Sequence, residues 1–146
     1  MRSPSGKPLR SLFLRGHIWL VATVIPLSVK VFSISRLTRL LTPPAWLHPY
    51  AGIPAEQIAA SVAHRLRNPR VMRRRACLRE GLTLFHFLRL AALPAVLRIS
   101  VYPPSQDPQR LHAHCWITVG DNCLSAPATG PAAVVFTTEA GGQVTE

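Results

Sequence analysis

A chain of 146 residues is long enough for one domain with a modest hydrophobic core and too short for two such domains. Apolar residues make up 48% of the chain, which excludes general disorder even though 14 prolines are present. All 17 Lys and Arg residues lie between Arg2 and Arg110, and so basic a surface attracts polyanions such as nucleic acid, an anionic membrane or an acidic peptide.

The N-terminal part divides into a tail and an apolar, basic segment. Residues 1–10 have no hydrophobic period and are predicted to be a flexible tail. Residues 11–50 are predicted to form an N-terminal helical segment that Pro26 breaks or kinks. Its apolar run IWLVATVIPLSV (18–29) has about half the length that spans a bilayer. Two interpretations stay open: a basic amphipathic helical hairpin with peripheral membrane contact, or a removable signal sequence.

A proline-rich linker, residues 42–54, ends this segment. Trp46 and Tyr50 within it are expected to pack against the rest of the protein, as aromatic residues in such loops usually do. A helix is predicted to begin at Pro54, a favourable first-turn residue, and the sequence RNPR (67–70) ends it.

The remaining elements are one further helix and several strands. The helix has Cys77 at or near its start and ends before Pro94. GDN (120–122) is predicted to form a hairpin turn, and strands are predicted at 95–102, 111–119, 123–127 and 132–138. Helices followed by an antiparallel meander make an α+β fold, and its core is expected within residues 51–140.

The cysteine content indicates a compartment. Three cysteines are an odd number, and their spacing has no pairing pattern: Cys77, Cys115 and Cys123. This usage fits a reducing compartment better than a disulfide scaffold, so a cytoplasmic location is predicted.

Cys77 is the first candidate for chemistry. The start of a helix and the arginines at 73–75 both stabilise a thiolate, so this thiol can be nucleophilic. A cysteine nucleophile also needs a base, which a histidine far along the chain supplies in acyl-transfer enzymes. The alternative is that Cys77 is a small apolar side chain in the core.

Two stretches resemble one known family. RRACLREGLTLFHFLRLAALPAVLRISV (74–101) resembles its Cys-Leu helix and the strand after it, and LHAHCWITVGDN (111–122) resembles its Ala-His-x-Trp strand and hairpin turn. The family is the transglutaminase-like leader peptidases of lasso-peptide biosynthesis, which includes the C-terminal domain of the microcin J25 processing protein. The resemblance covers roughly residues 57–135.

This resemblance implies a papain- or transglutaminase-like fold and a cysteine peptidase that removes the leader from a ribosomally synthesised precursor peptide. Cys77 is then the nucleophile, and His114, in the Ala-His-x-Trp position, is the general base. The resemblance also implies two protein partners, a separate leader-recognition protein and an asparagine-synthetase-like cyclase. No cofactor is expected.

The third catalytic position is where the chain departs from the family. The family has an aspartate on the return strand of the hairpin, where this chain has Cys123, Leu124 and Ser125. The two-residue period of a strand places Ser125 on the same face as His114, so Ser125 is a weak candidate for this position. Use of another acid such as Glu139, or a degenerate site, stays open.

The strand that carries His114 offers further site residues. Alternation places His112, His114 and Trp116 on one face. Trp116 and His112 are therefore predicted to bind substrate, and His112 is the alternative base.

Other ligands fit the sequence less well. Four residues have the element types of a zinc site: His112, His114, Cys115 and Cys123. Because His114 and Cys115 point to opposite faces of a strand, no metal site is predicted. The basic run 70–79 lacks interleaved aromatic residues, so no nucleic acid partner is predicted.

The alternative function is a non-catalytic basic module that binds a membrane surface or an acidic protein partner.

Overall fold

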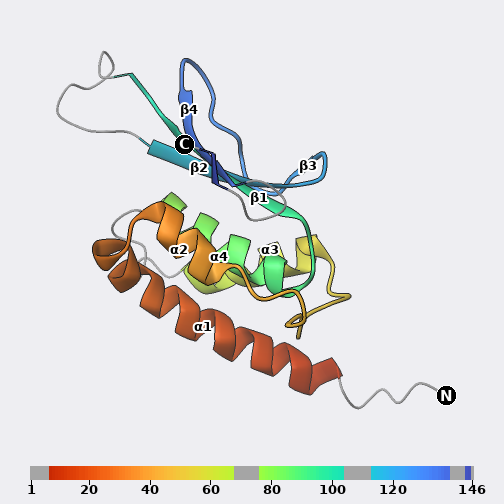
Figure 1. The fold of residues 1–146 in the computed structure, drawn as a ribbon. Coiled ribbons are helices and arrows are strands. Elements are labelled where there is room, and N and C mark those ends of the chain that lie inside the picture. The colour runs from red at the N-terminus through yellow and green to blue at the C-terminus, as the bar shows by residue number, and fades with distance from the viewer. Residues whose placement is uncertain (1–6, 68–75, 104–112, 139–143, 146) are drawn as a thin grey trace.

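The computed structural model describes residues 7–67, 76–103, 113–138 and 144–145. These residues form four helices and one five-stranded sheet (Figure 1). The helices are α1 (Lys7–Val31), α2 (Ile34–Leu41), α3 (Ala55–Leu66) and α4 (Ala76–Leu90). The strands are β1 (Ala95–Val101), β2 (Ala113–Val119), β3 (Asn122–Cys123), β4 (Ala133–Thr138) and β5 (Val144–Thr145). The predicted α+β class, with N-terminal helices followed by a small antiparallel sheet, is confirmed.

Helix α4 forms the centre of the molecule. It contacts α1 and α3 on one side and strands β1 and β2 on the other, so the helices cover one face of the sheet (Figure 1). Leu82 and Leu88 of α4 are fully buried, as are Leu97 and Ile117 of the sheet. The hydrophobic core therefore lies between α4 and the sheet, and the start of α4 is held against β2.

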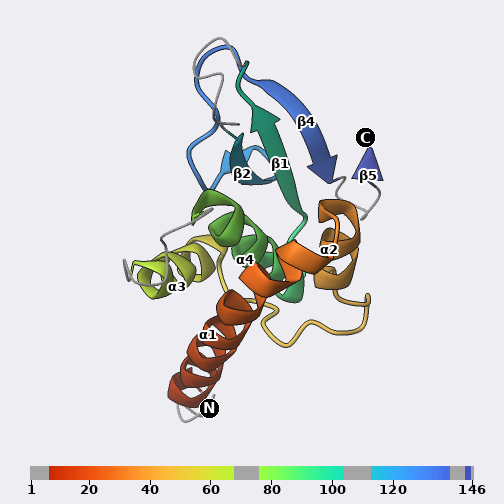
Figure 2. The same ribbon diagram turned by 90° about the vertical axis from the view of Figure 1, so that its left-hand side faces the viewer.

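The strand order differs from the predicted meander. The sheet has the order β3-β2-β1-β4-β5, and β4 pairs with β1 rather than with β3 (Figure 2). Strand β3 ends at Cys123, although the sequence predicts a strand over 123–127. The main chain bends at Leu124 and Ser125, so it leaves the sheet edge and returns on the other side of β1.

Pro26 does not break α1, which is continuous over 25 residues. A proline has no N–H, so the carbonyl of Ala22 loses its usual intrahelical donor. Arg79 of α4 replaces that donor: its Nε–H donates to the Ala22 oxygen at 2.7 Å, and its Nη2 donates to the same atom. A contact from another helix thus satisfies the carbonyl that the sequence alone leaves free.

The linker between α2 and α3 is anchored by one aromatic residue and not by the other. Tyr50 is 1% exposed, its hydroxyl lies 2.8 Å from Nδ1 of His17, and its ring contacts Phe87. The prediction that Trp46 also packs is wrong, because 81% of this residue is exposed. The Tyr50 cluster joins α1, the linker and α4.

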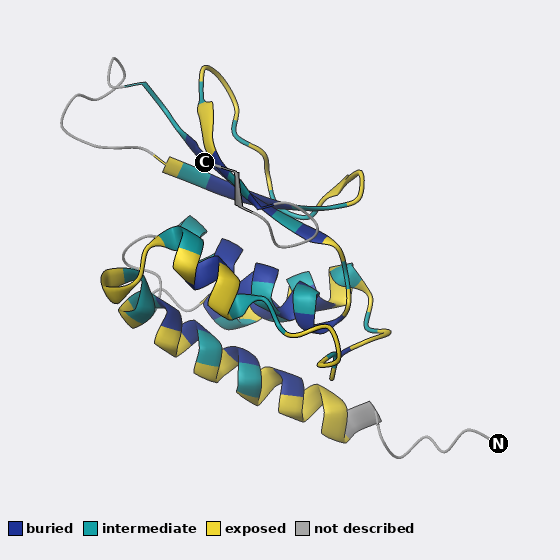
Figure 3. Ribbon diagram, in the orientation of Figure 1, coloured by how far each residue is buried: buried dark blue, intermediate teal, exposed yellow. Residues whose placement is uncertain are grey.

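Helix α1 begins at Lys7, within the segment predicted as a tail, and is apolar on two faces. Its inner face is buried against the other helices through Leu14, Ile18, Ala22 and Ile25. Figure 3 shows exposed residues along the outer face of α1. The large apolar residues among them are Leu9, Leu12, Phe13, Leu20, Val24, Leu27 and Val31. By length and composition alone, Leu9–Val31 is apolar enough to cross a membrane, with a mean hydropathy of 1.6. This segment is longer than the apolar run 18–29, because it also includes residues 9–17 and 30–31.

Candidate thiol site at the start of helix α4

Cys77 is the second residue of α4 and lies at the contact with β2. Its side chain is partly buried, and its thiol donates a hydrogen bond to the main-chain oxygen of Ala113 at 3.7 Å. The N–H groups of a helix's first turn have no intrahelical acceptor, so they favour a negative charge nearby. The predicted helix start at Cys77 thus matches the structure.

Strand β2 meets Cys77 with residues from both of its faces. The register pairs Cys115 with Ile99 and Ile117 with Leu97, so these side chains share the face that packs on the helices. His114 projects from the opposite face. Strand β3 pairs with β2 only at Thr118 and Val119. At His114, therefore, β3 does not cover the edge of β2.

One pocket brings the predicted residues together. It has a volume of about 270 Å³ and is lined by residues of α4, β2 and the segment after β3: Cys77, Glu80, Gly81, Leu84, His114, Cys115, Leu124, Ser125 and Ala126. Gly81 allows this approach, because a Cβ there would lie 2.7 Å from the Sγ atom of Cys115. Cys77, His114 and Ser125 thus share one cavity despite their separation in sequence.

The Cys77 thiol is more acidic than an ordinary cysteine. Its pKa is lowered from 9.0 to about 6, chiefly by a hydrogen bond from the Cys115 thiol. Burial opposes this shift, whereas the Cys115 main-chain N–H and the charge and hydrogen bond of His114 act in the same direction as the thiol. Cys77 is therefore largely a thiolate at neutral pH, which is the nucleophilic form.

Cys115 belongs to the site, although the sequence indicated it only as a zinc candidate. It is 4% exposed, and its thiol donates to the main-chain oxygen of Cys77 at 2.6 Å. The neighbouring Cys77 sulfur and burial both raise the Cys115 pKa, so Cys115 stays protonated. Its one S–H proton serves one acceptor at a time, and ionisation of Cys77 turns the Cys77 sulfur into the stronger acceptor.

The imidazole of His114 is held by main chain. Its Nε2 atom lies 2.6 Å from the carbonyl oxygen of Ala126. A carbonyl can only accept a hydrogen bond, so Nε2 carries the proton and Nδ1 of the neutral ring is the atom able to accept one. The Trp116 ring stacks on the imidazole, with the centroids 6.2 Å apart and 20° between the planes. The Trp116 ring thus lies along one face of the His114 imidazole.

Ser125 lines the pocket beside His114. Its hydroxyl accepts a hydrogen bond from the Ile117 N–H at 2.9 Å. The Cys123 thiol donates to the Ser125 carbonyl at 2.7 Å. These contacts fix the bend that presents the Ala126 carbonyl to His114. His112 and Glu139 lie outside the described residues.

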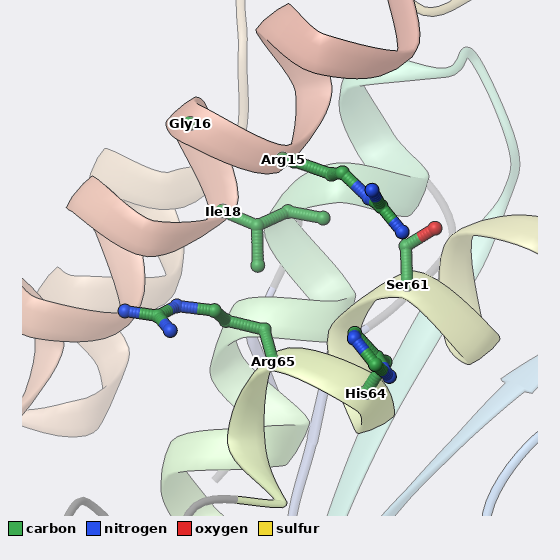
Figure 4. Close-up of a pocket in the computed structure, with 6 residues that line it drawn as sticks. All are labelled: Arg15, Gly16, Ile18, Ser61, His64 and Arg65. Atoms are coloured by element: carbon green, nitrogen blue, oxygen red, sulfur yellow. The ribbon is translucent and has the colours of Figure 1, made fainter.

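A second pocket, of about 370 Å³, lies between α1 and α3 and is rich in cations. Arg15 of α1 points towards Ser61 and His64 of α3, and Arg65 reaches towards α1 (Figure 4). The guanidinium of Arg65 also lies over the Trp19 ring, 5.7 Å from its centroid. Such a group of donors suits carboxylates or phosphates.

An α+β domain with a cysteine at the start of a central helix and a histidine on the adjacent strand has the arrangement of papain- and transglutaminase-like proteins. The chain belongs to the transglutaminase-like superfamily, whose family model matches residues 19–136. Comparison with curated proteins and with solved structures gives no match.

Proposed function

We propose that this protein is a cysteine peptidase that removes the leader from a lasso-peptide precursor. The observation that carries the proposal is that Cys77 and His114 line one pocket, and the lowering of the Cys77 pKa to about 6 supports it. The two sequence motifs that resemble the leader peptidases contain these two residues, and the family match supports the same fold.

The proposed reaction uses the Cys77 thiolate and the His114 imidazole in turn. The Cys77 thiolate attacks the carbonyl carbon at the leader–core junction, and a C–S bond forms. The C–N bond then breaks, and His114 as imidazolium gives its proton to the leaving amine. Water attacks the resulting thioester while His114 takes up the water's proton, which releases the leader carboxylate and regenerates Cys77.

The Ala126 carbonyl takes the orienting role that an aspartate has in the family. It accepts a hydrogen bond from the Nε2–H of His114 and so leaves Nδ1 available for proton transfer with Cys77. A carbonyl has no full negative charge, so it stabilises the imidazolium less than a carboxylate does. A dyad with a main-chain orienting group is thus our proposed alternative to a degenerate site.

The proposed reaction needs partners that the resemblance implies. A separate leader-recognition protein delivers the precursor peptide, and an asparagine-synthetase-like cyclase closes the ring on the freed amine.

The basic surface suits an acidic leader, and the pocket of Arg15 and Arg65 is one place where leader carboxylates can bind. We propose a cytoplasmic location for this maturation step.

Incubation of the precursor with this protein and the leader-recognition protein, followed by mass spectrometry, tests the proposal. The wild type is expected to release the leader, and Cys77→Ala is expected to release none because the thioester cannot form. Arg36→Ala is the control, since Arg36 is exposed on α2 and lies outside the pocket lining. Equal cleavage by wild type and Cys77→Ala would contradict the proposal.

A second function is favoured by the outer face of α1. Large apolar side chains there are exposed, among them Leu20 at 55% and Leu27 at 63%, and Arg15 and Lys30 lie on the same helix. Apolar residues beside cations are typical of helices that lie in the surface of an anionic membrane. The alternative function is therefore a non-catalytic basic module that binds a membrane surface, or an acidic protein partner through the same cations.

Vesicle flotation tests this alternative. Association is expected with vesicles that contain phosphatidylserine, and Leu20→Glu with Leu27→Glu is expected to abolish it, because burying two carboxylates in lipid is unfavourable. Val134→Glu is the control, since Val134 is 53% exposed on β4. Association that added salt does not weaken, or that the α1 substitutions leave unchanged, would exclude this surface as the contact.

A further inference from the structure

Two of the three thiols lie together at the contact between α4 and β2. We propose that Cys115 is a resolving cysteine, which forms an intrachain disulfide with Cys77 after a hydroperoxide has oxidised Cys77. This modification site goes beyond peptide cleavage, since it depends only on the chemistry and placement of the two thiols.

The geometry assigns unequal roles to the two sulfur atoms. Cys77 is partly exposed and lines the pocket, so a peroxide can reach it, whereas Cys115 is 4% exposed beneath it. The Cys115 thiol donates to the main-chain oxygen of Cys77 at 2.6 Å, and once Cys77 is ionised the same S–H can donate to the Cys77 sulfur instead. The lowered Cys77 pKa adds to this difference, because a thiolate is the form that peroxides oxidise.

The proposed disulfide forms in two steps. The Cys77 thiolate attacks one oxygen of a hydroperoxide, the O–O bond breaks, and Cys77 sulfenic acid forms as alkoxide or hydroxide leaves. The Cys115 sulfur then attacks the Cys77 sulfur, an S–S bond forms, and the sulfenic oxygen leaves as water with the Cys115 proton. Cys77 is thereby kept from irreversible oxidation to sulfinic acid, and a dithiol reductant restores both thiols.

The third cysteine provides an internal comparison. Cys123 is exposed, and its thiol donates to the Ser125 carbonyl rather than to Cys77. An accessible thiol that pairs at random would involve Cys123, whereas the proposed site uses the buried Cys115.

Peptide mapping of the full chain tests the proposal. The reduced protein is treated with one equivalent of hydrogen peroxide, remaining thiols are alkylated, and the protein is digested with trypsin and a protease that cleaves before Asp121. Cys77 and Cys123 then fall on different peptides from Cys115. We expect a Cys77–Cys115 linked peptide in the wild type and in Cys123→Ser, and its loss after addition of dithiothreitol.

The Cys115→Ser variant completes the test. Without the resolving thiol, Cys77 is expected to be trapped by dimedone as sulfenic acid and to proceed to sulfinic acid. A Cys77–Cys123 link in the wild type, or equal formation of Cys77 sulfinic acid in the wild type and Cys115→Ser, would overturn the proposal. The wild-type map alone decides whether the link forms, so it does not depend on the folding of the variant. Precursor cleavage measured on the reduced protein tests the peptidase function separately.

Discussion

Replacing His114 with alanine is expected to slow precursor cleavage by about 10²–10⁴-fold, the usual contribution of a positioned general base. The same change is expected to raise the pKa of Cys77, because the charge and hydrogen bond of His114 both lower it. Wild-type Cys77 is a thiolate above about pH 6 and a thiol below it. Its alkylation rate should therefore rise through about pH 6 in the wild type and at higher pH in the variant.

Alkylation of Cys77 by iodoacetamide, followed by mass spectrometry across a pH series, measures this shift without the precursor. His112→Ala is the comparison, since His112 is the other base that the sequence allows. If the pH dependence of alkylation and the rate of precursor cleavage match the wild type in His114→Ala but are altered in His112→Ala, the general base is His112. The hydrogen bond from Cys115 to Cys77 remains in both variants, so the pKa of Cys77 is not expected to rise to 9.0 in either of them.

Replacing Arg79 with alanine is expected to lower the free energy of unfolding by about 1–3 kcal/mol, the cost of an unsatisfied buried polar group. Ala22, whose carbonyl accepts from Arg79, is 2% exposed, and Pro26 supplies no N–H to it. In a Pro26→Ala background the N–H of residue 26 can donate to that carbonyl. Arg79→Ala is expected to cost clearly less there.

Urea unfolding of the wild type, the two single variants and the double variant gives this coupling free energy. The cycle cancels the other contacts of Arg79, which are lost equally in both backgrounds. Arg39→Ala, at an exposed position of α2, is the control and is expected to have little effect in either background. If the effects of Pro26→Ala and Arg79→Ala on the free energy of unfolding are additive, the two residues are not coupled through the Ala22 carbonyl.

Local signals predicted most elements. Pro54 directly precedes α3, Cys77 lies in the first turn of α4, and Pro94 lies between α4 and β1. These boundaries depend on neighbouring residues, because prolines and apolar periodicity act within a few positions. Strand order was not predictable in this way: β4 joins β1 because the chain bends at Ser125, where a serine hydroxyl caps a main-chain N–H of another strand.

The α+β class could be predicted from local patterns, because a helix start and an alternating strand each depend on neighbouring residues. Cys77 was predicted as the nucleophile from its place at a helix start, and His114 as the base from the resemblance of its strand to the family's Ala-His-x-Trp strand. The groups around Cys77 and His114 depend on how the helices and the sheet pack: the Cys115 thiol lies beside Cys77, and the Ala126 carbonyl accepts from His114. A main-chain oxygen has no sequence signature, and a buried cysteine looks like any small core residue until packing shows its neighbour.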